Sequence, residues 1–234
     1  MFEVTGKNLR EGLLLPIDKP SGWTSFDVVN KIRITLRKKF NRKNIKVGHG
    51  GTLDPLATGL LIIGIGPATK QLSSIQADRK TYEGTLFFGA ETPSYDAETE
   101  PHKIYDKPFP PRTLLYKTAK SMEGEQEQFP PLYSAVKVHG KKLYEYARQG
   151  EQKINIKPRH IIIYRFEITR ITPPYIDFMA EVSKGTYIRS LVHDFGKKLD
   201  NGAYLTALRR IRSGNFDIKD AIELKEWLKI NEKS

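Results

Sequence analysis

The chain contains no cysteine, which excludes disulfide bonds, thiolate metal ligands and a cysteine nucleophile. Long apolar runs are also missing. The longest, Gly59–Gly66 and His160–Tyr164, fall well short of the roughly 20 residues that a membrane-spanning helix needs. The N-terminus has no apolar segment between basic residues and a small-residue cleavage site, so we expect no secretory signal. These absences favour a cytoplasmic protein with no membrane partner.

Acidic residues are scarce relative to basic ones. The 234 residues include 27 Asp and Glu against 39 Lys and Arg, a formal net charge of +12. Such an excess suits a polyanionic partner, because each neutralised phosphate releases condensed counterions. A basic enzyme that binds no nucleic acid has the same composition, so charge alone leaves both interpretations open.

The periodicity of apolar residues predicts helices and strands mixed along the whole chain. An inward stripe at i, i+4 spacing predicts a helix over Phe26–Phe40, capped by Thr24 or Ser25. Further helices are expected over Thr113–Met122, Ile188–Leu199, Tyr204–Ile211 and Lys219–Ile230, and strands over Lys80–Gly89, His160–Ile171 and Tyr175–Ser183. Ala90–Pro111 has the composition of an exposed connection. Regular βαβ alternation is missing, which favours an α+β fold with a mixed or antiparallel sheet.

The segment Val47–Lys70 concentrates glycines around one acid, Asp54. A phosphate-binding loop would need Lys and Ser or Thr after Gly64, and this chain has Ile65 and Gly66 there instead. The second half of the segment is apolar, as a buried strand would be. What remains is a tight loop that presents His49 and Asp54 immediately before that strand.

Asp54 itself has two interpretations. It precedes Pro55, and Asp-Pro is common in ordinary turns. A carboxylate in a glycine-rich loop beside an apolar strand is equally suited to act as a nucleophile or base. Composition does not separate these alternatives.

Five separated segments, in order, resemble the TruB family of tRNA pseudouridine synthases. They are IDKPSGWTS (Ile17–Ser25), GHGGTLDPLATGLL (Gly48–Leu61), KTYEGTLFFG (Lys80–Gly89), FPPLYSAVKVHGKKLYEYAR (Phe129–Arg148) and SKGTYIRSLVHDFG (Ser183–Gly196). LRRIRSGNF (Leu208–Phe216) fits as well. The resemblance covers most of the chain and implies the α+β pseudouridine-synthase fold, with a mixed or antiparallel central sheet split by a catalytic cleft and flanked by helices.

The resemblance implies an isomerisation in which uracil is detached from its ribose, rotated and rejoined through C5. No redox cofactor is needed, because nothing is oxidised. The implied catalytic residues are Asp54, which would act on the sugar or base as a carboxylate, Arg189, whose charge would oppose and steer it, and Tyr82, whose ring would stack on the target base. His49 corresponds to the residue that helps to turn the base out of its stack.

Other residues receive roles from the same resemblance. Lys19 would support the catalytic loop, and Asp96 would contact substrate, although Thr99 replaces the glycine usual in that loop. An insertion at about residues 128–155 would grip RNA through Tyr133, Lys137, Lys141, Lys142 and Arg148. Arg209, Arg210 and Arg212 form a second basic cluster. In an arbitrary protein such a cluster is more often a solvated face, and here it is a candidate for phosphate contacts. We expect no metal site, because the other histidines (His102, His139, His160 and His193) have no ligand spacing.

The expected partner is tRNA, bound through its T arm and T loop, with the uridine at position 55 as the target. No obligate protein partner is expected. The chain is expected to form one catalytic domain over residues 1–234, without the separate C-terminal RNA-binding domain that many family members carry. Two alternatives stay open: a guide-RNA-dependent pseudouridine synthase of other RNA, and a non-catalytic tRNA-binding or RNA-folding protein.

Overall fold

The computed structural model describes residues 2–149 and 154–232. The chain divides into two compact units, one formed by its two ends, up to Tyr82 and from Arg209, and the other by Glu83–Leu208. Strands β4 (Lys80–Phe88) and β12 (Ala203–Ser213) each contain one of the two points where the chain passes between units. None of the helices in the described ranges is long and apolar enough to cross a membrane.

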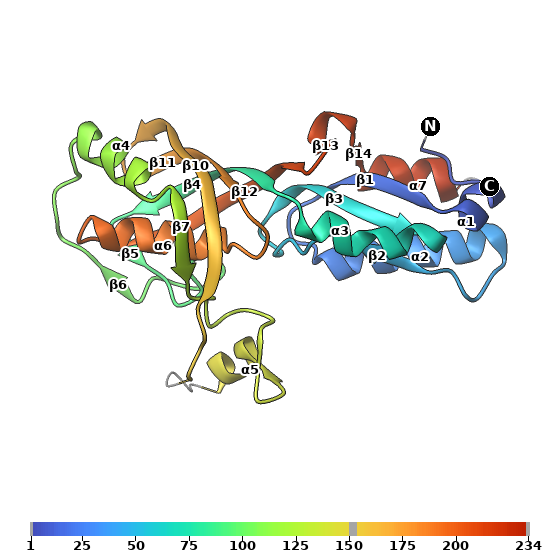
Figure 1. The fold of residues 1–234 in the computed structure, drawn as a ribbon, viewed down its shortest axis with the longest axis horizontal. Coiled ribbons are helices and arrows are strands. Elements are labelled where there is room, and N and C mark those ends of the chain that lie inside the picture. Colours follow the sequence, from blue (N-terminus) through green and yellow to red (C-terminus); the bar gives the residue numbers. More distant parts are fainter. Residues whose placement is uncertain (1, 150–153, 233–234) are drawn as a thin grey trace. The chain divides into compact units, whose positions relative to one another are not determined.

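The first unit is built on a mixed sheet in the order β14-β1-β3-β12 (Figure 1). β1 (Leu13–Lys19) pairs antiparallel with β3 (Thr58–Ile65) along its whole length. β14 (Ile222–Glu223) runs parallel to β1, and the end of β12 runs parallel to the start of β3. The short strands β2 (Val47–His49) and β13 (Phe216–Asp217) pair with β3 and β12. The expected α+β class with a mixed sheet is therefore confirmed.

Helices cover both faces of this sheet. On one face, α3 (Leu72–Ala77) packs Leu72 and Ile75 against Leu60 and Ile62 of β3. Because strand side chains alternate, Leu61 and Ile63 point to the opposite face, where α2 (Ser25–Phe40) contacts α7 (Leu224–Glu232). The remaining helices of the unit are α1 (Gly6–Glu11) and the 3₁₀ segments η1 (Gly66–Gln71) and η2 (Ile218–Asp220).

Helix α2 begins where the sequence predicts. The Thr24 side chain accepts a hydrogen bond from the Asp27 backbone N–H, and the Asp27 carboxylate accepts one from the Thr24 N–H at 2.9 Å. This reciprocal cap satisfies two of the donors that a helix start leaves unpaired. The helix ends in basic residues and then Asn41, whose left-handed conformation (φ 46°) turns the chain away.

The second unit carries the strand order β12-β4-β11-β10-β7 (Figure 1). The two strands expected over His160–Ile171 and Tyr175–Ser183 are confirmed as β10 (Arg159–Thr172) and β11 (Tyr175–Val182), which pair antiparallel, and β7 (Gly124–Gln128) pairs with β10. Helix α4 (Arg112–Ser121) contacts β10 and α6 (Ile188–Lys198), while Phe195 of α6 packs edge-on against Phe88 and Phe166 of the sheet. Smaller elements are β5 (Ala90–Glu91), β6 (Lys103–Ile104), β8 (Lys137–Val138), β9 (Lys141–Lys142) and α5 (Leu143–Arg148).

The prediction of a helix over Tyr204–Ile211 is wrong. These residues lie in strand β12, where Ala203, Leu205, Leu208 and Arg210 are buried between more exposed neighbours. Leu, Ala and Arg favour helices when isolated, so local preference pointed the wrong way. Pairing on both sides within the sheet overrides it.

Two further expectations need correction. The last helix begins at Leu224 rather than Lys219, because Ile222 and Glu223 pair with β1 as strand β14. The connection Ala90–Pro111 is also less exposed than expected. It forms the strand pair β5–β6, and both Thr92 and Asp96 within it are fully buried.

Candidate active site

Asp54 sits in the loop between β2 and β3, and both sides of that loop are fixed. Leu53 is buried and is bound by Ser25, whose Oγ accepts from the Leu53 N–H (2.8 Å) and donates to its carbonyl (3.1 Å). The Ala57 N–H closes the turn by donating to the Asp54 carbonyl at 3.1 Å. Gly51 supplies a φ of +123° that side-chain-bearing residues rarely adopt. The half-buried Asp54 therefore has little freedom of backbone position.

Lys19 ties this loop to the end of β1. Its side chain is fully buried, and its ammonium donates to the carbonyls of Pro20 (2.9 Å), Trp23 (2.5 Å) and Pro55 (3.4 Å). The Gly22 N–H donates to the same Pro55 carbonyl at 2.9 Å. A buried ammonium needs such acceptors, and here one of them immediately follows Asp54. These contacts fit the supporting role expected for Lys19.

Arg210 holds the loop from the sheet side. Its side chain is 1% exposed; Nε donates to the Leu60 carbonyl at 2.7 Å, and Nη2 donates to the Gly51 carbonyl at 3.1 Å. A guanidinium enclosed in this way cannot reach a phosphate at the surface, so the RNA-contact role predicted for Arg210 does not fit its environment. Gly59, opposite Arg210 in the strand pair, permits the close approach, since a Cβ there would lie 2.4 Å from the Arg210 carbonyl oxygen.

His49 and Tyr82 lie in strands of the same unit. His49 ends β2, paired with Ile63. Burial lowers the pKa of its imidazole, and the charge of Arg210 lowers it further, so the ring is neutral at pH 7. Tyr82 is buried in β4 on the same side of the strand as Leu86 and Phe88.

Arg189 and Asp96 form a buried pair in the second unit. Arg189 Nη1 lies 3.4 Å from Asp96 Oδ2, and the same nitrogen donates to the carbonyls of Ser94 and Tyr133, each at 3.1 Å. Asp96 Oδ1 accepts from Ser94 Oγ (2.5 Å) and from the Glu98 N–H (3.0 Å). The sequence suggested both residues separately but gave no sign that they contact each other.

Thr99, which departs from the family pattern, is part of the loop that carries Asp96. Its hydroxyl accepts from the Ser94 N–H at 3.2 Å and lies 2.7 Å from Ser94 Oγ. Ser94 in turn donates to the Asp96 carboxylate. The threonine side chain thus helps to shape the loop through contacts that a glycine could not make.

Several positioning residues were missed from the sequence. The Gln128 side-chain amide brackets Tyr187, accepting from its N–H (2.8 Å) and donating to its carbonyl (3.1 Å), which fixes the chain just before α6 and Arg189. Tyr95, with a φ of +63°, stacks on His193 at 3.8 Å, one helical turn after Arg189. The sequence gives no signal for these contacts, because the partners are far apart in the chain. Gln128 and Tyr187 are separated by 59 residues, and Ser25 and Leu53 by 28.

Within the predicted insertion, aromatic and basic side chains do lie together. Lys141 sits over the Tyr146 ring (4.3 Å to its centroid), and Lys142 sits 5.4 Å from that of Tyr144. Lys137 is exposed and Tyr133 is half-buried. The Arg148 side chain, and residues 150–153 of the insertion, lie outside what the structure describes.

The other two arginines of the second cluster are more accessible than Arg210. Arg209 binds the Asp18 carboxylate through both terminal nitrogens, at 3.1 and 2.6 Å. Arg212 is exposed, with its Nε 3.4 Å from Asp217. Arg209 could therefore bind a phosphate only while its guanidinium also holds the Asp18 carboxylate.

Comparison with known proteins shows which fold and which family the chain has. The solved structure of a Cbf5–Nop10–Gar1 complex contains a chain that matches 95% of this one with a TM-score of 0.72 and 30% identity, although the match covers 55% of that chain. The tRNA pseudouridine synthase B of Flavobacterium johnsoniae is 49% identical over 94% of this chain and 96% of its own length, and that of Chlorobaculum tepidum is 47% identical over 92% and 88%. The fold is the pseudouridine-synthase fold.

Family models resolve the class further. The model described as TruB family pseudouridylate synthase (N terminal domain) matches residues 37–188, and the one described as tRNA pseudouridylate synthase B C-terminal domain matches residues 189–233. The chain belongs to the TruB family of pseudouridylate synthases. The two models meet within the first turn of α6, inside the second compact unit, and the expected single catalytic domain stays a prediction.

Proposed function

We propose that this enzyme converts the uridine at position 55, in the T loop of tRNA, to pseudouridine, with Asp54 as the catalytic carboxylate. The observation that carries the proposal is the seating of Asp54 between two anchored neighbours, Leu53 bound by Ser25 and Pro55 bound by Lys19. An ordinary surface Asp-Pro turn would not need a buried ammonium and a buried hydroxyl to hold it. The relatives named tRNA pseudouridine synthase B supply the substrate class.

The reaction balances without a cofactor. The bond between N1 and C1′ breaks, the uracil rotates, and a bond between C5 and C1′ forms. C5 then loses its proton and N1 gains one. Asp54 acts either as a nucleophile toward the sugar or base or as the base that removes the 2′-hydrogen, and each role uses the ionised carboxylate. We assign the catalytic cation of this reaction to Arg189, whose guanidinium pairs with Asp96.

The target base has to leave its stack before Asp54 reaches it. His49, a neutral flat ring beside the loop, is suited to filling the vacated space, and Tyr82 is suited to stacking on the extruded uracil. Contacts to the T arm come from the insertion and from the accessible arginines (Tyr133, Lys137, Lys141, Lys142, Arg148, Arg209 and Arg212).

A tritium-release assay tests this function. A tRNA transcript labelled at uridine C5 is incubated with the purified protein and with no other RNA or protein. We expect release of one label per tRNA, and loss of that release when position 55 is cytidine. Asp54→Asn should release none, whereas Asp220→Asn, at an exposed carboxylate, should match the wild type. Release that requires an added guide RNA, or release by Asp54→Asn, would overturn the proposal.

A further inference from the structure

The first unit contains a groove to which the proposed chemical step assigns no ligand. It has a volume of about 650 Å³ and lies between the end of β1, the start of β3, and helices α2 and α7. Its apolar surface comes from Pro20, Trp23, Leu224 and Leu228. Trp23 is half-buried, so part of its indole is available to a ligand.

The groove is joined to the Asp54 loop through shared residues. Lys19 lines the groove and also donates to the Pro55 carbonyl. Thr58, at the start of β3, lines it four residues after Asp54. The Trp23 backbone is fixed by the same ammonium, because Lys19 donates to its carbonyl. A ligand in the groove therefore lies beside the segment that seats the catalytic carboxylate.

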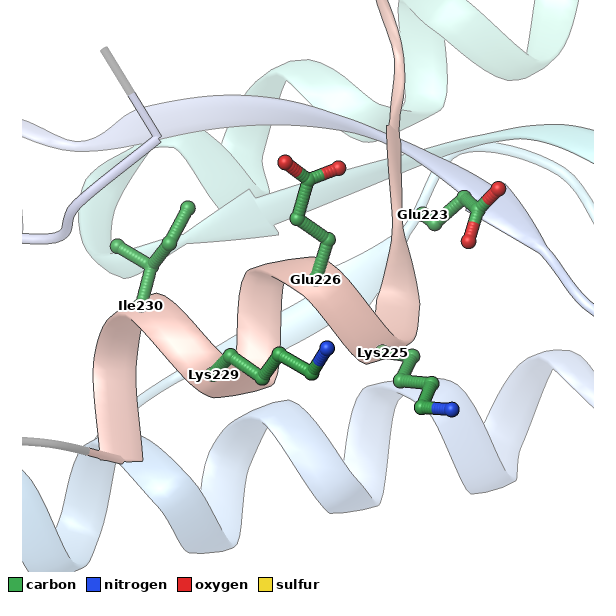
Figure 2. A pocket seen from close by; sticks show the side chains of 5 residues that line it. All are labelled: Glu223, Lys225, Glu226, Lys229 and Ile230. Carbon is green, nitrogen blue, oxygen red and sulfur yellow. The ribbon is translucent and has the colours of Figure 1, made fainter.

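Basic residues outnumber acidic ones around this apolar surface. Arg209, Lys31 and Lys225 line the groove with Asp18 and Glu223. Two of the cations are partly neutralised, since Arg209 pairs with Asp18 and Lys31 lies 3.2 Å from Glu232. Lys225 is exposed. Figure 2 draws a neighbouring pocket that Lys225 also lines, and it shows Lys225 leaving α7 on the same side as Lys229, opposite Glu226 and Ile230.

We propose that this groove binds one nucleotide of the RNA substrate, outside the catalytic centre. The base stacks against Trp23 and the two leucines, and the phosphate is held by Lys225 with Lys31. An aromatic surface beside cations is the combination that binds single nucleotides without reading their sequence. An apolar peptide would match the leucines but would make no use of the exposed ammonium of Lys225. This proposal rests on the proposed function, since it takes RNA as the substrate.

Tryptophan fluorescence provides a direct test. The chain has two tryptophans, and Trp227 is fully buried, so emission that acrylamide quenches reports Trp23. The probe is a full-length tRNA transcript, bound at saturation to the Asp54→Asn protein so that no turnover occurs. We expect the quenching constant to fall at least about twofold, and the quenchable emission to be missing in Trp23→Phe. Unchanged quenching in the bound complex would overturn the proposal and leave the groove to an apolar protein segment.

A matched pair of lysines gives an independent readout. Lys225→Ala should raise KM for tRNA about three- to tenfold with kcat unchanged, and should lower the slope of log affinity against log salt by roughly 0.7 to 1, as expected for one lost phosphate contact. Lys229→Ala removes an equal charge from the same helix. Lys229 lines the neighbouring pocket of Figure 2 and is not among the residues that line the groove, so the KM of this variant should stay at the wild-type value. Equal effects of the two variants would contradict a specific contact. Tritium release by the wild type tests the reaction itself and does not depend on the groove.

Discussion

Arg210 shows how a charged side chain can serve as internal scaffolding. Its guanidinium is enclosed and donates to the carbonyls of Gly51, Leu60 and, more weakly, Thr52 at 3.5 Å. Each of these carbonyls belongs to the Asp54 loop or to the strand that follows it. Three nearby arginines in one strand looked alike in sequence. Alternation along the strand separates the buried Arg210 from Arg209 but not from Arg212, which is exposed near the end of β12, where it pairs with Asp217 of β13.

Removing this guanidinium should destabilise the protein. Arg210→Ala leaves buried carbonyls without donors, and we expect it to lower the free energy of unfolding by about 2–4 kcal/mol. Arg212→Ala, at an exposed position, should change it by less than about 0.5 kcal/mol. Urea denaturation followed by circular dichroism measures both. Equal midpoints for the two variants would show that the buried contacts of Arg210 contribute little.

His193 and Asp194 predict a pH dependence with opposing signs. Burial, with help from the charge of Lys197, lowers the pKa of His193 to about 4, whereas burial raises the pKa of Asp194 to about 6 against the pull of Lys197 and Lys198. Between pH 4 and 6.5 the unfolded chain binds the His193 proton and the folded chain does not, so that residue's contribution to stability rises with pH. Between pH 3.8 and 6 the folded chain holds the Asp194 proton, so its contribution falls with pH.

The two contributions should nearly cancel in the wild type between pH 4 and 6. Relative to the wild type, Asp194→Asn should gain stability as pH rises through this range, and His193→Gln should lose it, each by at most about 1.4 kcal/mol per pH unit. Urea midpoints measured every half pH unit would show this. Parallel curves for all three proteins would mean that neither pKa is shifted by folding.

Among the elements, the pairing of β3 with β12 depends on a single glycine. Gly59 has a φ of +97°, and a Cβ there would lie 2.4 and 2.8 Å from the backbone oxygen and nitrogen of Arg210. Backbone atoms in a paired strand cannot move aside as a flexible side chain can. Gly89 has a similar φ of +111° but open space around its Cβ position, so it isolates the cost of the dihedral angle.

We therefore expect Gly59→Ala to be more damaging than Gly89→Ala. The positive φ alone should cost roughly 1–3 kcal/mol in each variant, and the clash adds to this only at Gly59. Thermal unfolding of the two variants gives the comparison. A smaller or equal loss at Gly59 would indicate that β12 shifts away from β3 without penalty.

The same elements show what the sequence could predict. Helix α2 has its cap, its apolar stripe and its basic end within 18 residues, so local information determines it. Strand β12 is defined by partners far away in the chain, and its Leu, Ala and Arg content favours the wrong structure. The candidate active site likewise has residues that the sequence identifies and contacts that only the folded structure shows. The resemblance identified Asp54 and Arg189, whereas the contacts that hold them, from Ser25, Gln128 and Arg210, depend on folding.

At the scale of the whole molecule, the net charge of +12 should make tRNA binding strongly dependent on salt. Each cation of the insertion that contacts a phosphate should add a small amount to the slope of log affinity against log salt. Lys137, which is exposed, is the simplest to remove. Lys137→Ala should lower the slope of log affinity against log salt by roughly 0.7 to 1 while the same uridine is modified. Filter binding at several salt concentrations, with the modified position mapped in parallel, measures both. A change of target uridine would contradict a role confined to phosphate contacts.

We propose that the Asp54 carboxylate performs the isomerisation and is not needed to hold the RNA. The most direct test is single-turnover conversion by Asp54→Asn, with tRNA affinity measured on the same preparation. We expect wild-type affinity within about threefold and no pseudouridine above the uncatalysed background. Conversion at a substantial fraction of the wild-type rate, or loss of binding together with activity, would contradict it.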